Sequence, residues 1–252
     1  MTTFSPKTGV VILAAGQGKR MKSNIPKVMH ELHGKPMIGH MVDAVMASGV
    51  TDKPVVVVSP QSDLIRKYLG DKVEYAVQTQ QLGTAHATAE AEEVMNTVDC
   101  VLVLYGDLPL LSSSTIETFT KFPKENIVMG TTTVQDFEGE RKAFYSFGRI
   151  LRDEQGHVIN IREMKDCSPE ELDIRELNTG LYSFPATWLW GHVKKTETNN
   201  AQGEHYLTDV IFMAMKEGLQ IDTVNVPVKE SFGISSQEDL AFAHSFTYSM
   251  EE

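Results

Sequence analysis

Short runs of β-branched residues alternate with segments of helical periodicity along the first half of the chain. Five runs have the length and composition of buried strands: GVVILAA, PVVVVS, VEYAVQ, CVLVLYGD and IVMGTTTV. Two intervening segments predict helices, one with an apolar face of Met37, Ile38, Met41, Val42 and Val45, and the other being TAHATAEAEEVMN. Apolar strands separated by helices are typical of parallel sheets. The pattern therefore predicts an α/β fold of the Rossmann-like type, with a mixed, mostly parallel sheet and helices on both faces.

The second half follows a looser pattern. From about Glu138, FGRILRDEQGHVINIREMKD predicts a hairpin that turns at 153–156, and ELNTGLYSF predicts a further strand. HYLTDVIFMAMKEG then predicts an amphipathic helix that ends at a glycine, QIDTVNV a late strand, and 237–249 a closing helix. We interpret this half as a small β subdomain that covers a substrate.

Composition and charge narrow the functional classes. The chain has 252 residues, of which 41% are hydrophobic and 23% charged, and this suits one globular α/β domain or a domain plus a small subdomain. The formal net charge is −11, with 23 Lys and Arg against 34 Asp and Glu, which argues against a nucleic-acid-binding surface. An anionic ligand must therefore be held by a local cluster of cations.

Neither the apolar segments nor the cysteines point to a membrane or an oxidising compartment. No apolar stretch is long enough to cross a bilayer, and MTTFSPKTG lacks the apolar core of a signal peptide, so we expect a cytoplasmic protein without a membrane partner. Cys100 and Cys167 lie far apart in apolar and loop-like contexts, so we expect reduced thiols.

The first strand ends in a glycine-containing, basic turn, VVILAAGQGKRM. It lacks the spacing of a P-loop, and Met21 stands where a dinucleotide-binding turn needs a third glycine. What remains is a strand, two glycines that allow backbone N–H groups to face a ligand, and three nearby cations: Gly16, Gly18, Lys19, Arg20 and Lys27. This set suits a triphosphate. Taken alone, it equally suits a tight strand-to-helix connection with solvated cations.

Seven motifs together resemble one family across nearly the whole chain. In order they are LAAGQGKRM, PKVMHELHGKPM, QTQQLGTAHA, YGDLPLL, FGRI, ELNTGLY and NNAQGEHYLTDVI. They resemble the uridyltransferase (pyrophosphorylase) domain of the bacterial GlmU family, which makes UDP-N-acetylglucosamine from UTP and N-acetylglucosamine 1-phosphate. The resemblance implies one nucleotidyltransferase domain with a nucleotide-binding part at 1–137, a sugar-binding part at 138–235 and a closing helix at 236–252. The acetyltransferase half of that family has no counterpart, so we expect no acetyltransfer.

The resemblance assigns base recognition to Gln78 and Gly83, with the backbone of Leu13, Ala14 and Ala15 beside them. Uracil presents an acceptor, a donor and an acceptor along one edge, which an amide side chain and backbone groups can read. The same resemblance places Gly16, Thr84 and Gly106 in the substrate site. Without the other motifs, QTQQLGT would be interpreted as a polar loop that caps the helix beginning near Thr84.

The implied reaction is an in-line attack of the sugar phosphate on the α-phosphorus of UTP, with pyrophosphate leaving. The attacking oxygen is already anionic, so catalysis consists of positioning and charge neutralisation, which the resemblance assigns to Arg20, Lys27 and Mg²⁺. Asp107 follows a strand at the edge where open α/β sheets bind ligands, and a carboxylate suits Mg²⁺. Its alternative role is that of a turn residue before Pro109.

For the sugar, the resemblance points to polar residues of the second half and to two tyrosines. Carboxylate and amide groups can bond to sugar hydroxyls and to the acetamide. The implied sugar site comprises Gly148, Glu163, Asn178 and Thr208, with Tyr105 and Tyr206 nearby. Asn199 and Asn200 are weaker candidates that also suit a role in shaping their loop.

One position departs from the family. Its second metal ligand is an Asn after a Gly-apolar pair, whereas SFGISSQEDL places Ser235 there. A hydroxyl is a shorter and poorer ligand, so Ser235 would hold Mg²⁺ weakly or through water. Ser235 with Glu238 also fits a helix-capping box, and both roles can coexist.

We therefore predict a Mg²⁺-assisted nucleotidyltransferase that acts on UTP and N-acetylglucosamine 1-phosphate. Two alternatives stay open: another nucleotide or sugar 1-phosphate as substrate, and a regulatory protein that binds nucleotide sugars and has lost turnover through the change at Ser235. The sequence does not determine the oligomeric state.

Overall fold

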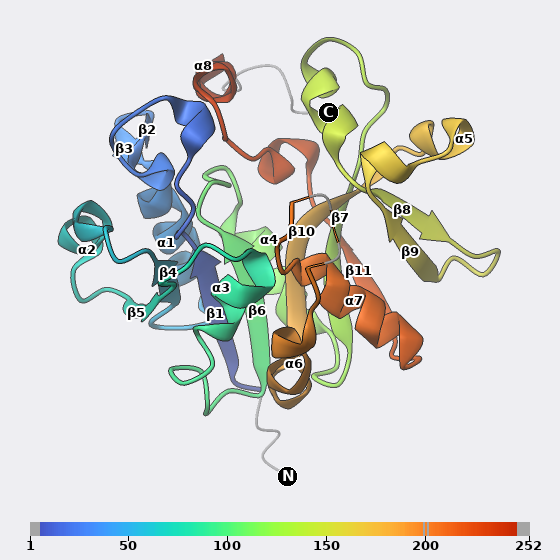
Figure 1. Cartoon of the computed structure of the whole chain (residues 1–252), viewed down its shortest axis with the longest axis horizontal. Helices are drawn as coiled ribbons and strands as arrows, with labels where there is room; N and C mark the ends of the chain where they lie inside the picture. Colours follow the sequence, from blue (N-terminus) through green and yellow to red (C-terminus); the bar gives the residue numbers. More distant parts are fainter. Residues whose placement is uncertain (1–5, 199, 201, 246–252) are drawn as a thin grey trace.

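In the part of the chain that the computed structural model describes, residues 6–198, 200 and 202–245, nine strands form one mixed sheet (Figure 1). Seven strands follow the order β11-β7-β10-β6-β1-β4-β5, and the hairpin β8–β9 branches from β10. The strands are β1 (Thr8–Leu13), β4 (Val55–Val58), β5 (Glu74–Val77), β6 (Cys100–Tyr105), β7 (Ile127–Thr133), β8 (Arg149–Arg152), β9 (Val158–Arg162), β10 (Glu176–Pro185) and β11 (Ile221–Asn225). β2 (Glu31–Leu32) and β3 (Lys35–Pro36) pair separately.

The predicted Rossmann-like half is confirmed. Strands β5, β4, β1 and β6 are mutually parallel, with Ile12 of β1 opposite Val56 of β4 and Leu104 of β6. Their carboxyl ends therefore meet at one edge of the sheet, and the loops that follow them lie close together.

The second half enters the main sheet as well as forming the predicted hairpin. β10 lies between β6 and β7 and is antiparallel to both, while β11 is parallel to β7. The hairpin turns at 153–156, as predicted. The Gly156 amide donates to the Asp153 carbonyl at 3.0 Å and closes this turn. Leu177 of β10 pairs with Arg149 of β8, which attaches the hairpin to the sheet.

Alternating side chains divide the core between the two faces of the sheet. Val10 and Ile12 of β1 pack on one face, under helices α1 (Met37–Ser48), α2 (Asp63–Leu69) and α4 (Ser113–Thr118). Val11 and Leu13 pack on the other, under α3 (Thr84–Ala89), α6 (Ala186–His192) and α7 (Leu207–Lys216). Helices cover both faces, as predicted, because every second strand residue points to the same side.

A third apolar cluster joins segments that are distant in sequence. It contains Met21 of the basic turn after β1 and Phe144 of the 3₁₀ segment Gly139–Ser146. It also contains Phe232 and, from the closing helix α8 (Gln237–Ser245), Leu240. The remaining helix is the short α5 (Pro169–Leu172), and shorter 3₁₀ turns cover Lys19–Met21, Lys27–Met29, Phe119–Lys121, Met164–Asp166, Val193–Lys195 and Val228–Ser231. This cluster fixes the basic turn beside the second half of the chain.

The helices differ from prediction mainly in length. α3 ends at Ala89, although TAHATAEAEEVMN predicts a longer helix, because tight turns follow in which the Glu92 amide donates to the Ala89 carbonyl. α7 ends before Gly218, which adopts the left-handed φ of 72°. Of the helices within the described residues, none combines the length and the apolarity needed to span a membrane.

Candidate active site

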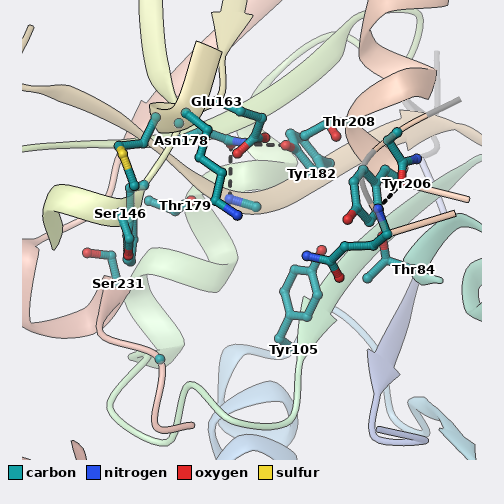
Figure 2. A pocket seen from close by; sticks show the side chains of 18 of the residues that line it. Thr84, Tyr105, Ser146, Glu163, Asn178, Thr179, Tyr182, Tyr206, Thr208 and Ser231 are labelled. Atoms are coloured by element: carbon teal, nitrogen blue, oxygen red, sulfur yellow. Dashed lines mark hydrogen bonds between the residues drawn. The ribbon is translucent and has the colours of Figure 1, made fainter. Parts of the chain in front are cut away.

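A cavity of about 610 Å³ opens at the carboxyl edge of the central strands (Figure 2). Its walls come from the end of β6, from β10, from the segments that flank the hairpin β8–β9 and from the start of α7. Eight of the sequence-predicted site residues line it: Thr84, Tyr105, Asp107, Gly148, Glu163, Asn178, Tyr206 and Thr208. The other predicted residues lie outside this lining: Leu13, Ala14, Ala15, Gly16, Arg20, Lys27, Gln78, Gly83, Gly106 and Ser235.

At one side of the cavity, Lys27 and Asp107 form a direct ion pair between the Lys Nζ and a carboxylate oxygen. Their side chains are 19% and 15% exposed, so the pair is sheltered and still reachable from solvent. Gly18 adopts a left-handed φ of 60°, and a Cβ there would lie 2.5 Å from the Cβ of Lys27. The glycine thus lets the basic loop pack closely on Lys27.

The same corner receives the segment before α8. The Ile234 amide donates to the Asp107 carbonyl at 2.9 Å, which places Ser235 next to the candidate metal ligand along the backbone. The predicted capping box is wrong by one residue: the Ser236 hydroxyl accepts from the Asp239 amide at 3.0 Å, and the Asp239 carboxylate accepts from the Ser235 amide at 2.9 Å. Ser236 therefore caps the helix, and the Ser235 side chain is not needed for that role.

Arg20 takes a different position from Lys27. It is exposed in the turn Lys19–Met21, whose buried Met21 anchors the turn in the third apolar cluster. The structure therefore brings Lys27 to Asp107, while Arg20 stays at the surface of the basic loop.

The predicted base-reading residues gather beside the cavity, at the ends of β1 and β5. The Leu13 carbonyl accepts from the Gly106 amide at 3.0 Å, and the Ala14 amide donates to the Val57 carbonyl at 2.9 Å. Gln78 is only 3% exposed, and its amide nitrogen contacts the Gly83 carbonyl at 3.1 Å. Backbone hydrogen bonds at the ends of β1 and β5 therefore hold the predicted base-reading residues in place.

The loop after β5 is docked against the loop before α7. Gly83 has a φ of 115°, and a side chain there would overlap the backbone of His205. The His205 amide donates to the Leu82 carbonyl at 2.7 Å, and the His205 carbonyl accepts from the Ala85 amide at 2.9 Å. The Thr84 hydroxyl accepts from the Leu207 amide at 3.0 Å. Gly83 thus has a structural role, because it allows the predicted nucleotide and sugar halves to meet.

At the cavity wall formed by β10, the Asn178 amide is oriented by its neighbours. Its oxygen accepts from the Tyr182 hydroxyl at 3.0 Å and from the Gly180 amide at 3.0 Å, as the dashed lines in Figure 2 show. The Asn178 backbone amide donates to the Gly148 carbonyl at 2.9 Å. With the oxygen occupied, the Asn178 NH₂ group remains to donate to a ligand.

Glu163 and Tyr105 contribute ionisable groups with altered pKa values. Glu163 lines the cavity and is exposed to solvent, and its pKa is raised by desolvation and by the carboxylates of Asp166 and Asp209. Burial raises the pKa of Tyr105 to about 12, so its phenol stays neutral and can donate a hydrogen bond. Burial also raises the pKa of Tyr182 well above its usual value.

The sequence did not single out several residues that the cavity assembles. Tyr182 is fully buried and orients Asn178, and Gly180 packs on the ring of Tyr105. Tyr182 could have been identified from the sequence, because strand alternation in LNTGLYS places it on the same face as Asn178. Asn200, a weaker candidate from the sequence, also lines the cavity, and it shapes its loop because its side-chain oxygen accepts from the Gln202 and Glu204 amides at 3.2 Å. Asn199 lies outside the described residues.

The residues at Asp107 fit a Mg²⁺ ion that is shared with a nucleotide. Within the described residues, no three His, Cys, Asp or Glu side chains gather as a metal-binding group. Mg²⁺ usually takes one or two carboxylates and completes its shell with water and phosphate oxygens. A single sheltered carboxylate beside the basic turn after β1 meets that requirement.

Comparison with known proteins gives consistent matches. The MobA-like NTP transferase domain matches residues 10–158. The chain is 38% identical over 232 residues to the bifunctional protein GlmU of Clostridium tetani, which covers 92% of this chain and 50% of that protein. It is 40% identical over 241 residues to the bifunctional protein GlmU of Heliobacterium modesticaldum, covering 95% and 52% respectively. The chain spans about half the length of the curated relatives it matches.

Proposed function

The chain belongs to the family of MobA-like NTP transferase domains, and from this premise we propose that it is an N-acetylglucosamine-1-phosphate uridylyltransferase. The reaction joins UTP and N-acetylglucosamine 1-phosphate to give UDP-N-acetylglucosamine and pyrophosphate. The substrates are those predicted from the sequence motifs.

One observation carries this proposal. A single cavity has Asp107 at one side, paired with Lys27 outside the lining, and the oriented Asn178 amide with Glu163 at another. The first pair suits phosphates and a divalent cation, and the second suits hydroxyl and acetamide groups. A cavity of about 610 Å³ lies within the usual range for a small-molecule site.

The residues of this chain then act by positioning and by charge. An oxygen of the sugar phosphate attacks the α-phosphorus of UTP, and the bond to the pyrophosphate oxygen breaks. The attacking oxygen is anionic, so no residue has to remove a proton. Lys27 and Arg20 neutralise charge on the leaving pyrophosphate, while the Asn178 NH₂ group and the Glu163 carboxylate hold the sugar.

Enzymes of this family generally depend on Mg²⁺. We assign the metal to Asp107, with Ser235 as the neighbouring oxygen donor. The bound ion would neutralise phosphate charge and align the reacting groups. Because Asp107 is paired with Lys27, we expect the two side chains to exchange partners when nucleotide arrives, Lys27 turning to phosphate oxygens and Asp107 to the cation.

A pyrophosphate-release screen tests the proposal. The purified protein is incubated with each of UTP, CTP, ATP and GTP against a set of sugar 1-phosphates. The highest turnover is expected for UTP with N-acetylglucosamine 1-phosphate. Preference for another nucleotide would overturn the base assignment, and preference for glucose 1-phosphate would overturn the sugar assignment. Tight binding of nucleotide sugar without turnover of any pair would instead identify a regulatory protein.

A further inference from the structure

The Gln78 side chain is buried at the end of β5, and its amide group is held in one orientation. Its nitrogen lies 3.1 Å from the Gly83 carbonyl oxygen and 3.0 Å from Nδ1 of His86. Within the described residues no donor is bonded to the amide oxygen. The side chain therefore uses both of its donors inside the protein and leaves its acceptor to other partners.

The Gly83 carbonyl decides which end of the amide faces inward. A carbonyl oxygen only accepts, so the atom facing it must be the NH₂ nitrogen. This carbonyl is itself rigid, because it also accepts from the Ala87 amide at 3.0 Å in the first turn of α3. The close docking of Gly83 on His205 fixes the loop from the other side.

His86 completes the orientation. Since the second N–H of Gln78 points to Nδ1, that ring nitrogen must be unprotonated and act as the acceptor. The proton of the neutral ring then sits on Nε2, which faces the Glu90 carboxylate at 3.4 Å. Glu90 thereby favours the tautomer that Gln78 requires.

We propose that His86, acting through Gln78, sets the preference of this enzyme for uracil over cytosine. The inference rests on the proposed function, in which Gln78 reads the base. Uracil carries an N3–H donor, which the free Gln78 oxygen can accept. Cytosine carries an acceptor at N3, which would face that oxygen without a hydrogen bond. An amide free to turn over would serve cytosine equally well. His86 is thus a positioning residue for specificity.

The experiment measures kcat/KM for UTP and for CTP with the preferred sugar 1-phosphate in the parent, His86→Leu and His86→Asn. Leu removes the acceptor, whereas Asn can keep an oxygen near the Nδ1 position. The UTP/CTP ratio should fall roughly threefold to tenfold in His86→Leu, the size expected for one net neutral hydrogen bond. It should stay near the parent value in His86→Asn. The KM for the sugar 1-phosphate should not change in either.

A double-mutant cycle separates specificity from general damage. In a Gln78→Ala background, adding His86→Leu should leave the UTP/CTP ratio unchanged, because the amide that His86 orients is absent. Thermal melting of each variant reports on folding. An unchanged ratio in His86→Leu, or an equal fall in the Gln78→Ala background, would overturn the inference alone. A parent enzyme without UTP preference would overturn both this inference and the base assignment of the proposed function.

Discussion

The two sides of the cavity handle charge in different ways. At the side proposed to bind phosphate, Lys27 and Asp107 neutralise each other, so under the proposed function we expect both to find new partners when substrates bind. At the sugar side, Asn178 is already oriented by Tyr182 and Gly180. The side proposed to bind the sugar therefore has its polar group oriented before any ligand arrives, whereas we propose that the phosphate side is completed by its ligands. Substitutions at the first side should therefore affect turnover, and those at the second should affect sugar binding.

The largest effect is expected at Asp107. Asp107→Asn removes the carboxylate assigned to Mg²⁺ and breaks the pair with Lys27, so turnover should fall by about 10²–10³-fold or more. Pyrophosphate release measures it, and Asp166→Asn, at another carboxylate of the same cavity, serves as the control. Turnover within a few-fold of the parent would leave Asp107 as a turn residue before Pro109.

Removing either cation should come next. Lys27→Ala and Arg20→Ala each remove a charge that stabilises the leaving pyrophosphate, and one such contact contributes about 2.7–4 kcal/mol to lowering the barrier. The exposed Lys22→Ala, in the same loop, is the matched control. Because Arg20 is exposed and Lys27 is sheltered, the comparison also tests whether both cations reach the phosphates. Near-normal turnover in one variant would assign that cation to the solvated surface.

The metal affinity should respond to Ser235. Ser235→Asn places an amide oxygen at the position where the family has its second metal ligand. The Mg²⁺ concentration for half-maximal activity should therefore fall by up to about tenfold, which corresponds to about 1.4 kcal/mol of metal-binding free energy. Ser236→Ala is the control, because it removes the helix cap at a cost of about 1 kcal/mol of stability without moving the Mg²⁺ midpoint. An unmoved midpoint in Ser235→Asn would mean that Asp107 holds the metal alone.

A smaller effect is expected at the prepared side of the cavity. Tyr182→Phe keeps the buried ring and removes the hydroxyl that orients Asn178, so the KM for the sugar 1-phosphate should rise about threefold to tenfold. The KM for UTP should not change, and Tyr75→Phe, distant on β5, is the control. Equal changes in both KM values would show that Tyr182 supports the fold generally and leaves the contrast between the two sides without support.

The smallest effect concerns stability and pH. Because the pKa of Glu163 is raised, the folded chain holds this proton to higher pH than the unfolded chain, and stability falls as pH rises through that interval. Glu163→Gln removes this loss, so its melting temperature relative to the parent should be higher at about pH 8 than at about pH 4. The exposed Glu154→Gln gives the background effect of removing one charge. The gain in melting temperature should be small because Glu163 is exposed to solvent. A difference in melting temperature that does not change with pH would contradict the raised pKa of Glu163.

Much of the fold was predictable from local signals. The strands of the parallel half, the hairpin turn at Asp153–Gly156 and the glycine that ends α7 all follow from periodicity and turn chemistry. The length of α3 and the capping residue of α8 were not predicted correctly. After α3 the Glu92 amide bonds to the Ala89 carbonyl in a tight turn, and at α8 the Ser236 hydroxyl rather than that of Ser235 accepts from the helix. In each case two hydrogen bonds compete locally, and only the packed backbone selects one of them.

The sequence by itself determined the order of elements and the kinds of side chain at each strand end, because these depend on residues a few positions apart. Only the tertiary structure decided that β10 separates β6 from β7, that Lys27 meets Asp107, and that the Gln78 amide nitrogen faces the Gly83 carbonyl. These outcomes depend on contacts between residues that are distant in the chain or on the choice between two ends of one amide. Periodicity carries no information about such contacts, because they form only once the sheet order and the loop conformations are set.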